Sequence, residues 1–329
     1  MKTFFKVFII SFLFFIVALY VGSLSYLKEN NITLQNNLGL GFYEDININN
    51  AILDKFETNP KEAQTYPSLE SAFEKSSRIN FIIVGMEDVR TDTILFASLC
   101  PDSKKVDVLS IPRDTYVHRK GYNSGEQRKI NSVYNDHGIE GVKKTVSYIL
   151  GDAPIHHYVM VDYEGVEKIV DSIGGVEVEV PFHMKYKDPT AKPPLNIDIP
   201  AGKKLLDGKT ALDFIRYRKG NNKMGYKDGD LGRIKAQQRF LSAFASKASE
   251  NMLSVFMKGF NYVKTDINLI KGLSYVRNMA GFKMDNITFN TLPGEGDLRK
   301  VGKSILSYYF YNVEEVEKTL ESIYNVKTN

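Results

Sequence analysis

The stretch that decides the fold covers residues 81–111 and reads FIIVGMEDVRTDTILFASLCPDSKKVDVLSI. Its apolar parts are short and rich in β-branched and aromatic residues, which is typical of strands. They lie at residues 81–85, 93–100 and 106–111. Beyond them, helical and extended patterns alternate along the chain. The sequence therefore predicts an α/β fold in which helices flank a sheet.

The chain beyond residue 111 supplies the remaining elements. Apolar residues at helical spacing predict helices at residues 139–150, 163–173, 210–215, 234–248, 267–279 and 313–323. Alternating or β-rich runs predict strands at residues 157–161, 176–180 and 287–292. Thr265 and Asn312 are suited to cap the last two helices, because their side-chain oxygens can accept from free backbone N–H groups.

The N-terminal region differs from the rest of the chain. Residues 7–27 form an almost uninterrupted apolar run, long enough to cross the ~30 Å hydrocarbon layer of a membrane. Lys2 and Lys6 precede this run, so the positive-inside rule predicts a cytoplasmic N-terminus and an extracellular remainder. A cleaved signal peptide is the alternative, although Val21-Gly22-Ser23 offers only a weak cleavage site.

These features divide the chain into four parts. We expect a cytoplasmic N-terminus at residues 1–6, a transmembrane signal-anchor helix at 7–27, an extracellular stalk and lead-in at 28–79, and an extracellular globular domain at 80–329. Weak helical patterns lie in the lead-in at residues 50–56 and 69–73. The protein is thus expected in the cell membrane, crossing it once.

Composition limits the possible functions. The 329 residues carry a formal net charge of +4, and 43% of them are hydrophobic, which is typical of a globular protein. Lys2 and Lys6 contribute two of the positive charges, so the rest of the chain is too balanced for a non-specific nucleic-acid-binding surface. The single cysteine, Cys100, excludes an intramolecular disulfide and a multi-cysteine metal site.

Residues 216–238, RYRKGNNKMGYKDGDLGRIKAQQ, are rich in arginine, glycine and asparagine. Arg216 and Arg218 alternate in a short extended run, so both should point to one side. Arg233 and Gln237 lie four apart on a new helix, so they should share one face. Guanidinium groups bind phosphate oxygens in pairs, and a helix N-terminus adds amide donors. The stretch could hold a pyrophosphate, with solvated or carboxylate-paired basic side chains as the alternative.

Three further polar segments follow predicted strands or precede a predicted helix. Residues 85–93, GMEDVRTDT, carry three carboxylates, and such oxygen ligands suit magnesium, with a solvated turn as the alternative. Arg113 comes just after a strand and beside Asp114, where a surface ion pair between the two is a common outcome. Residues 125–131, GEQRKIN, form a basic loop that contains Lys129.

The order of these motifs is more specific than any one of them. GMEDVRTDT is followed by SIPRDTYV (110–117), RKINSVYNDHG (128–138), YVMVDYEGVEKIVDSIGGVEVEVP (158–181), LDGKTALDFIRYRK (206–219) and GDLGRIKAQQ (229–238). In this order the chain resembles the LytR-CpsA-Psr family of cell-wall glycopolymer transferases. The resemblance runs from residue 80 to about residue 250 and continues more weakly to about residue 296.

The resemblance implies a membrane-anchored enzyme on the outer face of a Gram-positive bacterium. Such enzymes move a teichoic acid, capsular polysaccharide or similar polymer from a polyprenyl pyrophosphate carrier to a peptidoglycan hydroxyl, leaving a phosphodiester. The family fold is a mixed central sheet between helices, with an apolar tunnel for the lipid. The family also implies Mg²⁺ as the cofactor.

Motif matching with the family implies roles for individual residues. The pyrophosphate would be held by Arg113, Lys129, Arg216, Arg218, Arg233 and Gln237. Asp92 matches the magnesium-site aspartate, and Glu87 stands where the family usually has a second aspartate. The residues implied in catalysis are Asp92, Arg113 and Arg233. The family usually has arginine at the position of Ala236, and the loop at residues 220–227 is longer than usual.

This assignment agrees with the needs of phosphoryl transfer. The reaction requires an oxygen nucleophile held in line and fixed cations to meet the spreading negative charge. The acceptor hydroxyl must also lose a proton, and a carboxylate near the metal is the expected base: Asp92 first, then Asp88 and Asp114. Two alternatives stay open, a pyrophosphatase that uses water on the same donor and a non-catalytic envelope regulator that binds polyanions or polyprenyl lipids.

Overall fold

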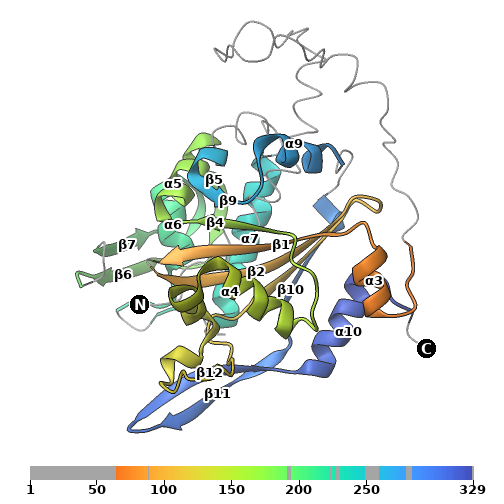
Figure 1. The fold of residues 1–329 in the computed structure, drawn as a ribbon. Coiled ribbons are helices and arrows are strands. Elements are labelled where there is room, and N and C mark those ends of the chain that lie inside the picture. The colour runs from red at the N-terminus through yellow and green to blue at the C-terminus, as the bar shows by residue number, and fades with distance from the viewer. Residues whose placement is uncertain are drawn as a thin grey trace, which may run out of the picture.

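A six-stranded mixed sheet forms the centre of the protein in the computed structural model (Figure 1). The structure describes residues 64–87, 89–190, 194–221, 224–226, 230–248, 259–278 and 284–327. The strand order in the sheet is β10-β3-β2-β1-β4-β9. In chain order these strands are β1 (Ile79–Glu87), β2 (Arg90–Cys100), β3 (Lys105–Ile111), β4 (His157–Val161), β9 (Val263–Thr265) and β10 (Ile287–Thr291).

The stretch at residues 81–111 forms the middle of this sheet, as its apolar runs predict. β1, β2 and β3 pair as an antiparallel meander, whereas β4 is parallel to β1 and β10 is parallel to β3. The carboxyl ends of β1, β3, β4 and β10 therefore lie at one edge of the sheet. The expected α/β fold with a mixed central sheet is confirmed.

Helices cover both faces of the sheet and form two hydrophobic cores (Figure 1). The first core contains α5 (Tyr163–Ser172), α6 (Gly208–Arg216), α7 (Asp230–Ala248) and α9 (Leu269–Asn278). The second contains α3 (Leu69–Lys75), α4 (Val133–Ile149) and α10 (Val313–Tyr324). Because side chains alternate along a strand, Phe81 and Ile83 enter the first core while Ile82 and Val84 enter the second.

Three smaller two-stranded sheets complete the structure. They pair β5 (Val176–Val180) with β8 (Gly202–Leu206), β6 (Met184–Asp188) with β7 (Leu195–Ile199), and β11 (Gly294–Val301) with β12 (Ser304–Tyr311). The strand expected at residues 176–180 is present as β5, but it lies outside the central sheet. The β11–β12 hairpin was not expected, because most of its residues are exposed and show no apolar alternation.

One predicted helix cap is correct and the other is wrong. The side chain of Asn312 accepts from Glu315 N at 3.1 Å and caps α10 as expected. Thr265 does not cap α9, because the helix begins only at Leu269. Its hydroxyl donates to Tyr158 O of β4 and accepts from Ile267 N at 3.2 Å. Asn268 takes that position and accepts from Lys271 N at 2.8 Å. Asn268 is the cap because it directly precedes the first helical residue, whereas Thr265 belongs to β9.

The segment before residue 80 is part of the packed body where the structure describes it. The helix expected at residues 69–73 is present as α3, and its Ala72 is fully buried. Tyr66 is also buried and pairs with Val326 in a parallel bridge. The expected anchor at residues 7–27 and helix at 50–56 lie outside the described residues. Among the described helices, none is long and apolar enough to span a membrane.

Close backbone packing joins α5 to α6 at Gly208. A Cβ built on Gly208 would lie 2.2 Å from the backbone oxygen of Glu167, and backbone atoms cannot give way as a side chain would. We expect Gly208→Ala to lower the free energy of unfolding by about 2 kcal/mol or more, as overpacking does. Denaturant unfolding measures this. Gly296→Ala is the control, because its Cβ would meet only Tyr308 O at 3.8 Å, and an equal loss in both variants would contradict the prediction.

Candidate functional site

The polar segments singled out in the sequence meet at the sheet edge where the parallel strands end. Gly85 of β1 pairs with Val161 of β4, and β3 ends at Ile111 beside the start of β2. Segments that leave these strands therefore begin close together. In open α/β sheets this edge is the usual position for a ligand site.

The segment at residues 85–93 is mostly strand, and not the polar loop that we expected. β1 and β2 continue to the pair Glu87 and Arg90, which leaves a tight turn between them. Gly85 pairs with Thr93 and Met86 pairs with Thr91, so Asp92 is an extra residue in a β-bulge. Bulges redirect side chains, and the carboxylate of Asp92 is completely buried.

Arg113 forms a buried ion pair with Asp92. Arg113 Nη1 lies 3.0 Å from Asp92 Oδ2, and only 10% of the Arg113 side chain is exposed. The surface pair of Arg113 with Asp114 that the sequence allowed is therefore wrong. Asp114 instead faces Lys129, with 3.3 Å between the two charged atoms. A buried ion pair contributes little net stability because both charges lose their water.

Burial and the neighbouring Glu87 raise the pKa of Asp92 to about 7. Glu87 acts through a hydrogen bond between the two carboxyl groups and through its charge, whereas Arg113 lowers the pKa. Neither oxygen of Asp92 accepts a well-aligned hydrogen bond from a donor in the described part of the chain. Two adjacent carboxyl groups, one of them buried without a well-aligned hydrogen-bond donor, fit a divalent cation.

The carboxyl groups of Asp92 and Glu87 suit a hard cation that takes its remaining ligands from water or substrate. Among the described residues, no three or more His, Cys, Asp or Glu side chains are arranged to hold a metal. Magnesium suits such a site, because it needs one or two carboxylates and completes its shell with water and phosphate oxygens. Asp92 and Glu87 are the residues that would hold it.

Tyr163 is a site residue that the sequence analysis missed. It begins α5 two residues after Val161, just as Glu87 lies two residues after Gly85 on the paired strand β1. Burial raises the pKa of Tyr163, Arg216 opposes the rise, and the carboxylate of Glu87, within hydrogen-bonding reach, adds to it. The sequence could not reveal that Tyr163 lies near Glu87, because the two residues are far apart along the chain. The parallel register of β1 and β4 brings them together.

Arg216 joins the same cluster through the aromatic ring of Tyr163. Its guanidinium carbon lies 4.7 Å from the ring centroid, which is a cation–π contact. We had expected Arg216 in a short extended run, but this is wrong, because Arg216 is the last residue of α6. Tyr217 follows it into the first core, and Arg218 is exposed. The structure thus brings Glu87, Asp92 and Arg216 close to Tyr163. Arg113 joins this cluster through its ion pair with Asp92.

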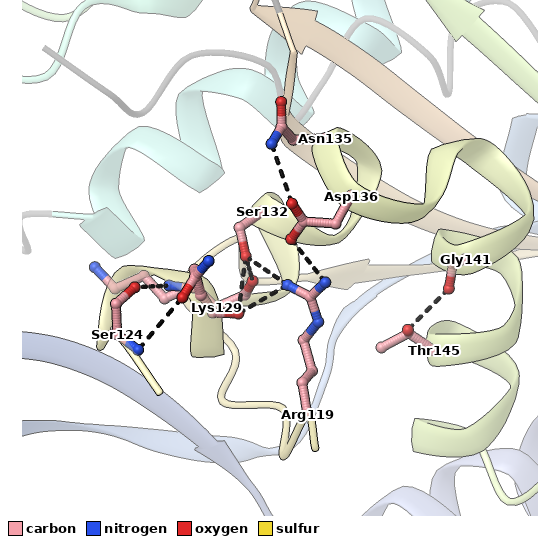
Figure 2. A network of polar contacts seen from close by, with 9 residues as sticks. Arg119, Ser124, Lys129, Ser132, Asn135, Asp136, Gly141 and Thr145 are labelled. Atoms are coloured by element: carbon pink, nitrogen blue, oxygen red, sulfur yellow. Dashed lines mark hydrogen bonds and ion pairs between the residues drawn. The ribbon is translucent and has the colours of Figure 1, made fainter. Parts of the chain in front are cut away.

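Lys129 is buried in a loop that supports the Arg113 segment. Two short 3₁₀ turns, Glu126–Arg128 and Ile130–Ser132, flank it, and its amine lies 3.1 Å from Glu126 and 3.3 Å from Asp114. Figure 2 shows the network that holds this loop. Lys129 therefore lies next to the Arg113 segment, but its charge is shared with two carboxylates.

Arg119 fixes the loop to α4. It forms a 2.7 Å ion pair with Asp136 and donates to the backbone oxygen of Gln127 at 2.9 Å (Figure 2). Its guanidinium group also stacks 3.8 Å from the ring centroid of Tyr122. Asn131 N then donates to Arg113 O at 3.2 Å. This chain of contacts holds the backbone of Arg113 in place.

Arg233 and Gln237 both lie on α7, four residues apart, so they share one helix face as the sequence predicts. Their side chains, like Asp88, lie outside the described residues, and their roles stay predictions. Ala236 lies between them and is 2% exposed within the first core. Where the family usually has an arginine, this chain therefore has a small apolar residue that packs in the first core.

A cavity of about 710 Å³ lies at the opposite edge of the sheet. It is lined by residues of β3, β10 and α10, among them Asp107, Asn290 and Lys318. Its walls are only slightly more polar than apolar, and a buried ion pair of Arg78 with Asp107 at 2.8 Å lies against it. This cavity is not the apolar tunnel that the family resemblance implies, and that tunnel stays a prediction.

Comparison with known proteins agrees with this architecture. The model of the family described as "LytR_cpsA_psr family" matches residues 43–324. The chain belongs to this family. The match begins within the expected lead-in, which agrees with the packing of α3 and Tyr66 against the rest of this family member.

Relatives of this family member include proteins of named function. The polyisoprenyl-teichoic acid–peptidoglycan teichoic acid transferase TagV of Bacillus subtilis (strain 168) is 29% identical over 300 residues, covering 86% of this chain and 74% of the relative. A transferase of the same description, TagU of Oceanobacillus iheyensis, is 29% identical and covers 78% of each chain. The crystal structure of B. subtilis TagV superposes with a TM-score of 0.62 at 28% identity, covering 77% of this chain and 100% of that one.

The raised pKa of Asp92 predicts a pH-dependent cost to stability. Below pH about 4 the carboxyl is protonated in both states, and between about 4 and 7 the unfolded chain loses the proton first. The free energy of unfolding should therefore fall as pH rises through this range. The free energy of unfolding of Asp92→Asn, measured relative to that of the wild type, should therefore be higher at pH 8 than at pH 5 by on the order of 2 kcal/mol.

Urea unfolding of both proteins at the two pH values, with a chelator present, measures this difference. Asp297→Asn on the exposed β11 strand is the matched control and should track the wild type. A stability difference between Asp92→Asn and wild type that does not change with pH would contradict the assignment.

Proposed function

We propose that the protein is a phosphotransferase that moves an anionic glycopolymer from a polyprenyl pyrophosphate carrier to a hydroxyl of peptidoglycan. The observation that carries the proposal is the meeting of two arginines, Arg113 and Arg216, with two carboxyl groups, Asp92 and Glu87, at the ligand-binding edge of the sheet. Relatives named as polyisoprenyl-teichoic acid–peptidoglycan teichoic acid transferases support the substrate class.

The reaction joins an acceptor oxygen to the phosphorus that carries the polymer. The bond from that phosphorus to the bridging oxygen of the pyrophosphate breaks, so polyprenyl monophosphate leaves and a phosphodiester forms. Arg113 and Arg216 meet the negative charge on the phosphate oxygens, and we assign the same role to Arg233. A bound Mg²⁺ supplies further charge neutralisation.

The proton of the acceptor hydroxyl must pass to a base. Asp114 is paired with Lys129, and Asp88 lies outside the described residues. We assign proton removal to the carboxyl pair of Asp92 and Glu87, which lies beside Arg113. Tyr163 lies near Glu87, and its ring contacts Arg216, so we assign it the role of positioning one acidic and one basic residue of the site.

The proposed setting follows from the substrate. A polyprenyl carrier lies in a membrane, so we propose that residues 7–27 anchor the chain and that the folded domain faces outward. The carrier tail would need the apolar tunnel implied by the family. Arg218, Lys129 and Gln237 complete the proposed pyrophosphate-binding set.

Loss of a site arginine should abolish transfer. We expect Arg113→Ala, Arg216→Ala and Arg233→Ala each to reduce transfer from a lipid-pyrophosphate donor by about 100-fold or more, because each removes a cation that stabilises the transition state. The assay follows labelled polymer into peptidoglycan. Lys203→Ala is the control, since its exposed amine pairs with Glu177 at 2.7 Å and its strand, β8, lies outside the central sheet.

The same assay separates the alternatives. Near-normal transfer by both Arg113→Ala and Arg233→Ala, with folding intact by circular dichroism, would refute the assigned roles. Release of free phosphorylated polymer with peptidoglycan present would indicate a pyrophosphatase. Failure of the wild type to act on the donor would indicate a binding protein.

Magnesium should stabilise the folded protein through Asp92 and Glu87. At pH 8 we expect added Mg²⁺ to raise the melting temperature of the wild type by several degrees and to have little effect on Asp92→Asn. Tyr163→Phe, which lacks the hydroxyl beside Glu87, should require more Mg²⁺ for the same shift. Thermal-shift titrations measure this, and equal responses in wild type and Asp92→Asn would place the ion elsewhere.

A further inference from the structure

The β11–β12 hairpin is attached to the segment that carries Arg113. Tyr309 N donates to Asp114 O at 2.9 Å, and Tyr116 N donates to Tyr309 O at 2.8 Å. Leu292, just before the hairpin, also donates from its N to Ser110 O at 2.8 Å. The hairpin therefore forms one unit with the Arg113 segment, and in Figure 1 its tip projects from the body of the molecule.

The two faces of the hairpin have different environments. One face packs on the loop before Lys129: Tyr308 Oη donates to Gly125 O at 2.8 Å, and a Cβ on Gly125 would meet Leu306 at 2.2 Å. Directly paired residues share a face, and successive residues alternate. The register pairs Leu298 with Ser307 and Lys300 with Ile305, so these four side chains lie on the opposite, outward face.

The outward face presents two aliphatic side chains beside one lysine, and a second lysine follows in the turn. Leu298 is 68% exposed and Ile305 is 70% exposed. They are diagonal neighbours across the hairpin, with Lys300 opposite Ile305 and Lys303 exposed in the turn. We call Leu298, Lys300, Lys303 and Ile305 the hairpin patch. Its charge is +2, because it contains both lysines and no acidic residue.

We infer that the hairpin patch docks on the anionic surface of a lipid bilayer. Isolated exposed aliphatic residues are common, but here two lie together, flanked by cations, on a hairpin whose other face is fixed. An anionic polysaccharide would satisfy the lysines and leave the aliphatic side chains in water. An anionic membrane accepts both, since aliphatic groups enter the acyl boundary and lysines meet the headgroups.

This inference rests on the proposed function, because the proposed donor is a membrane lipid. Docking of the hairpin would bring the attached Arg113 segment toward the level of the headgroups, where the pyrophosphate of the carrier lies. The patch would thus orient the site toward its lipid substrate. It is a positioning surface, and it takes no part in the chemistry.

Site-specific quenching in the full chain tests the docking directly. In a Cys100→Ser background, a fluorophore is attached at Leu298→Cys or Ile305→Cys, and the protein is placed in phosphatidylcholine nanodiscs with about a third phosphatidylglycerol and doxyl-labelled lipid. Leu205→Cys and Val313→Cys are matched controls, 63% and 67% exposed on other elements. We expect at least about twofold stronger quenching at the hairpin positions. Quenching equal to the controls would overturn the inference.

The charge of the surface is tested in the same system. The double variant Lys300→Glu/Lys303→Glu should reduce quenching at Leu298→Cys to the value seen in pure phosphatidylcholine discs. Quenching that stays unchanged in the double variant would overturn the assignment of an anionic partner. If the fluorophores on two copies of the protein quench each other in the absence of lipid, this face self-associates, and the inference of membrane docking is overturned.

Transfer assays separate this inference from the proposed function. Leu298→Ser/Ile305→Ser should raise the KM for donor embedded in anionic vesicles about tenfold and leave transfer from a short-chain, water-soluble donor unchanged. An equal loss with both donors would indicate damage to the site and overturn the docking role. If the wild type transfers neither donor, the proposed function fails while the quenching result still decides the docking.

Discussion

The structure depends on one costly arrangement, the burial of a carboxylate and a guanidinium group against each other at the end of the central sheet. Asp92 and Arg113 lie 3.0 Å apart with almost no access to water. Such a pair stabilises a fold poorly, because its desolvation offsets its attraction. Glu87 increases the cost, since it adds a second carboxyl group beside the first. Burial and this neighbour together raise the pKa of Asp92 to about 7. Buried charged groups with a shifted pKa are typical of functional sites that bind charged ligands.

The rest of the fold holds this arrangement in place. The bulge in β2 turns Asp92 inward, and the end of β3 places Arg113 beside it. The parallel pairing of β1 with β4 brings Tyr163 next to Glu87, and Tyr163 in turn holds Arg216. The site is therefore built from strand ends and helix termini, whose positions two hydrophobic cores fix.

Membership of the LytR_cpsA_psr family and the geometry of the site lead to the same chemistry. Phosphoryl transfer needs positioned cations more than a protein nucleophile, and the cluster supplies two arginines beside two carboxyl groups in a largely buried setting. The hairpin of β11 and β12 adds a physical link between this site and its surroundings. It is hydrogen-bonded to the segment of Arg113 and presents aliphatic and basic side chains outward.

The sequence by itself determined the three central strands, the flanking helices, the cap at Asn312 and the family, because apolar periodicity and ordered motifs are local properties of the chain. Motif matching also selected Glu87, Asp92, Arg113 and Arg216, which the structure brings together. Tertiary structure alone decided the partners. The bulge at Asp92, the pairing of Asp114 with Lys129 and the role of Tyr163 follow from strand register and loop packing, which join residues far apart in sequence. The hairpin patch was likewise invisible in the sequence, since exposure depends on what the rest of the chain leaves uncovered.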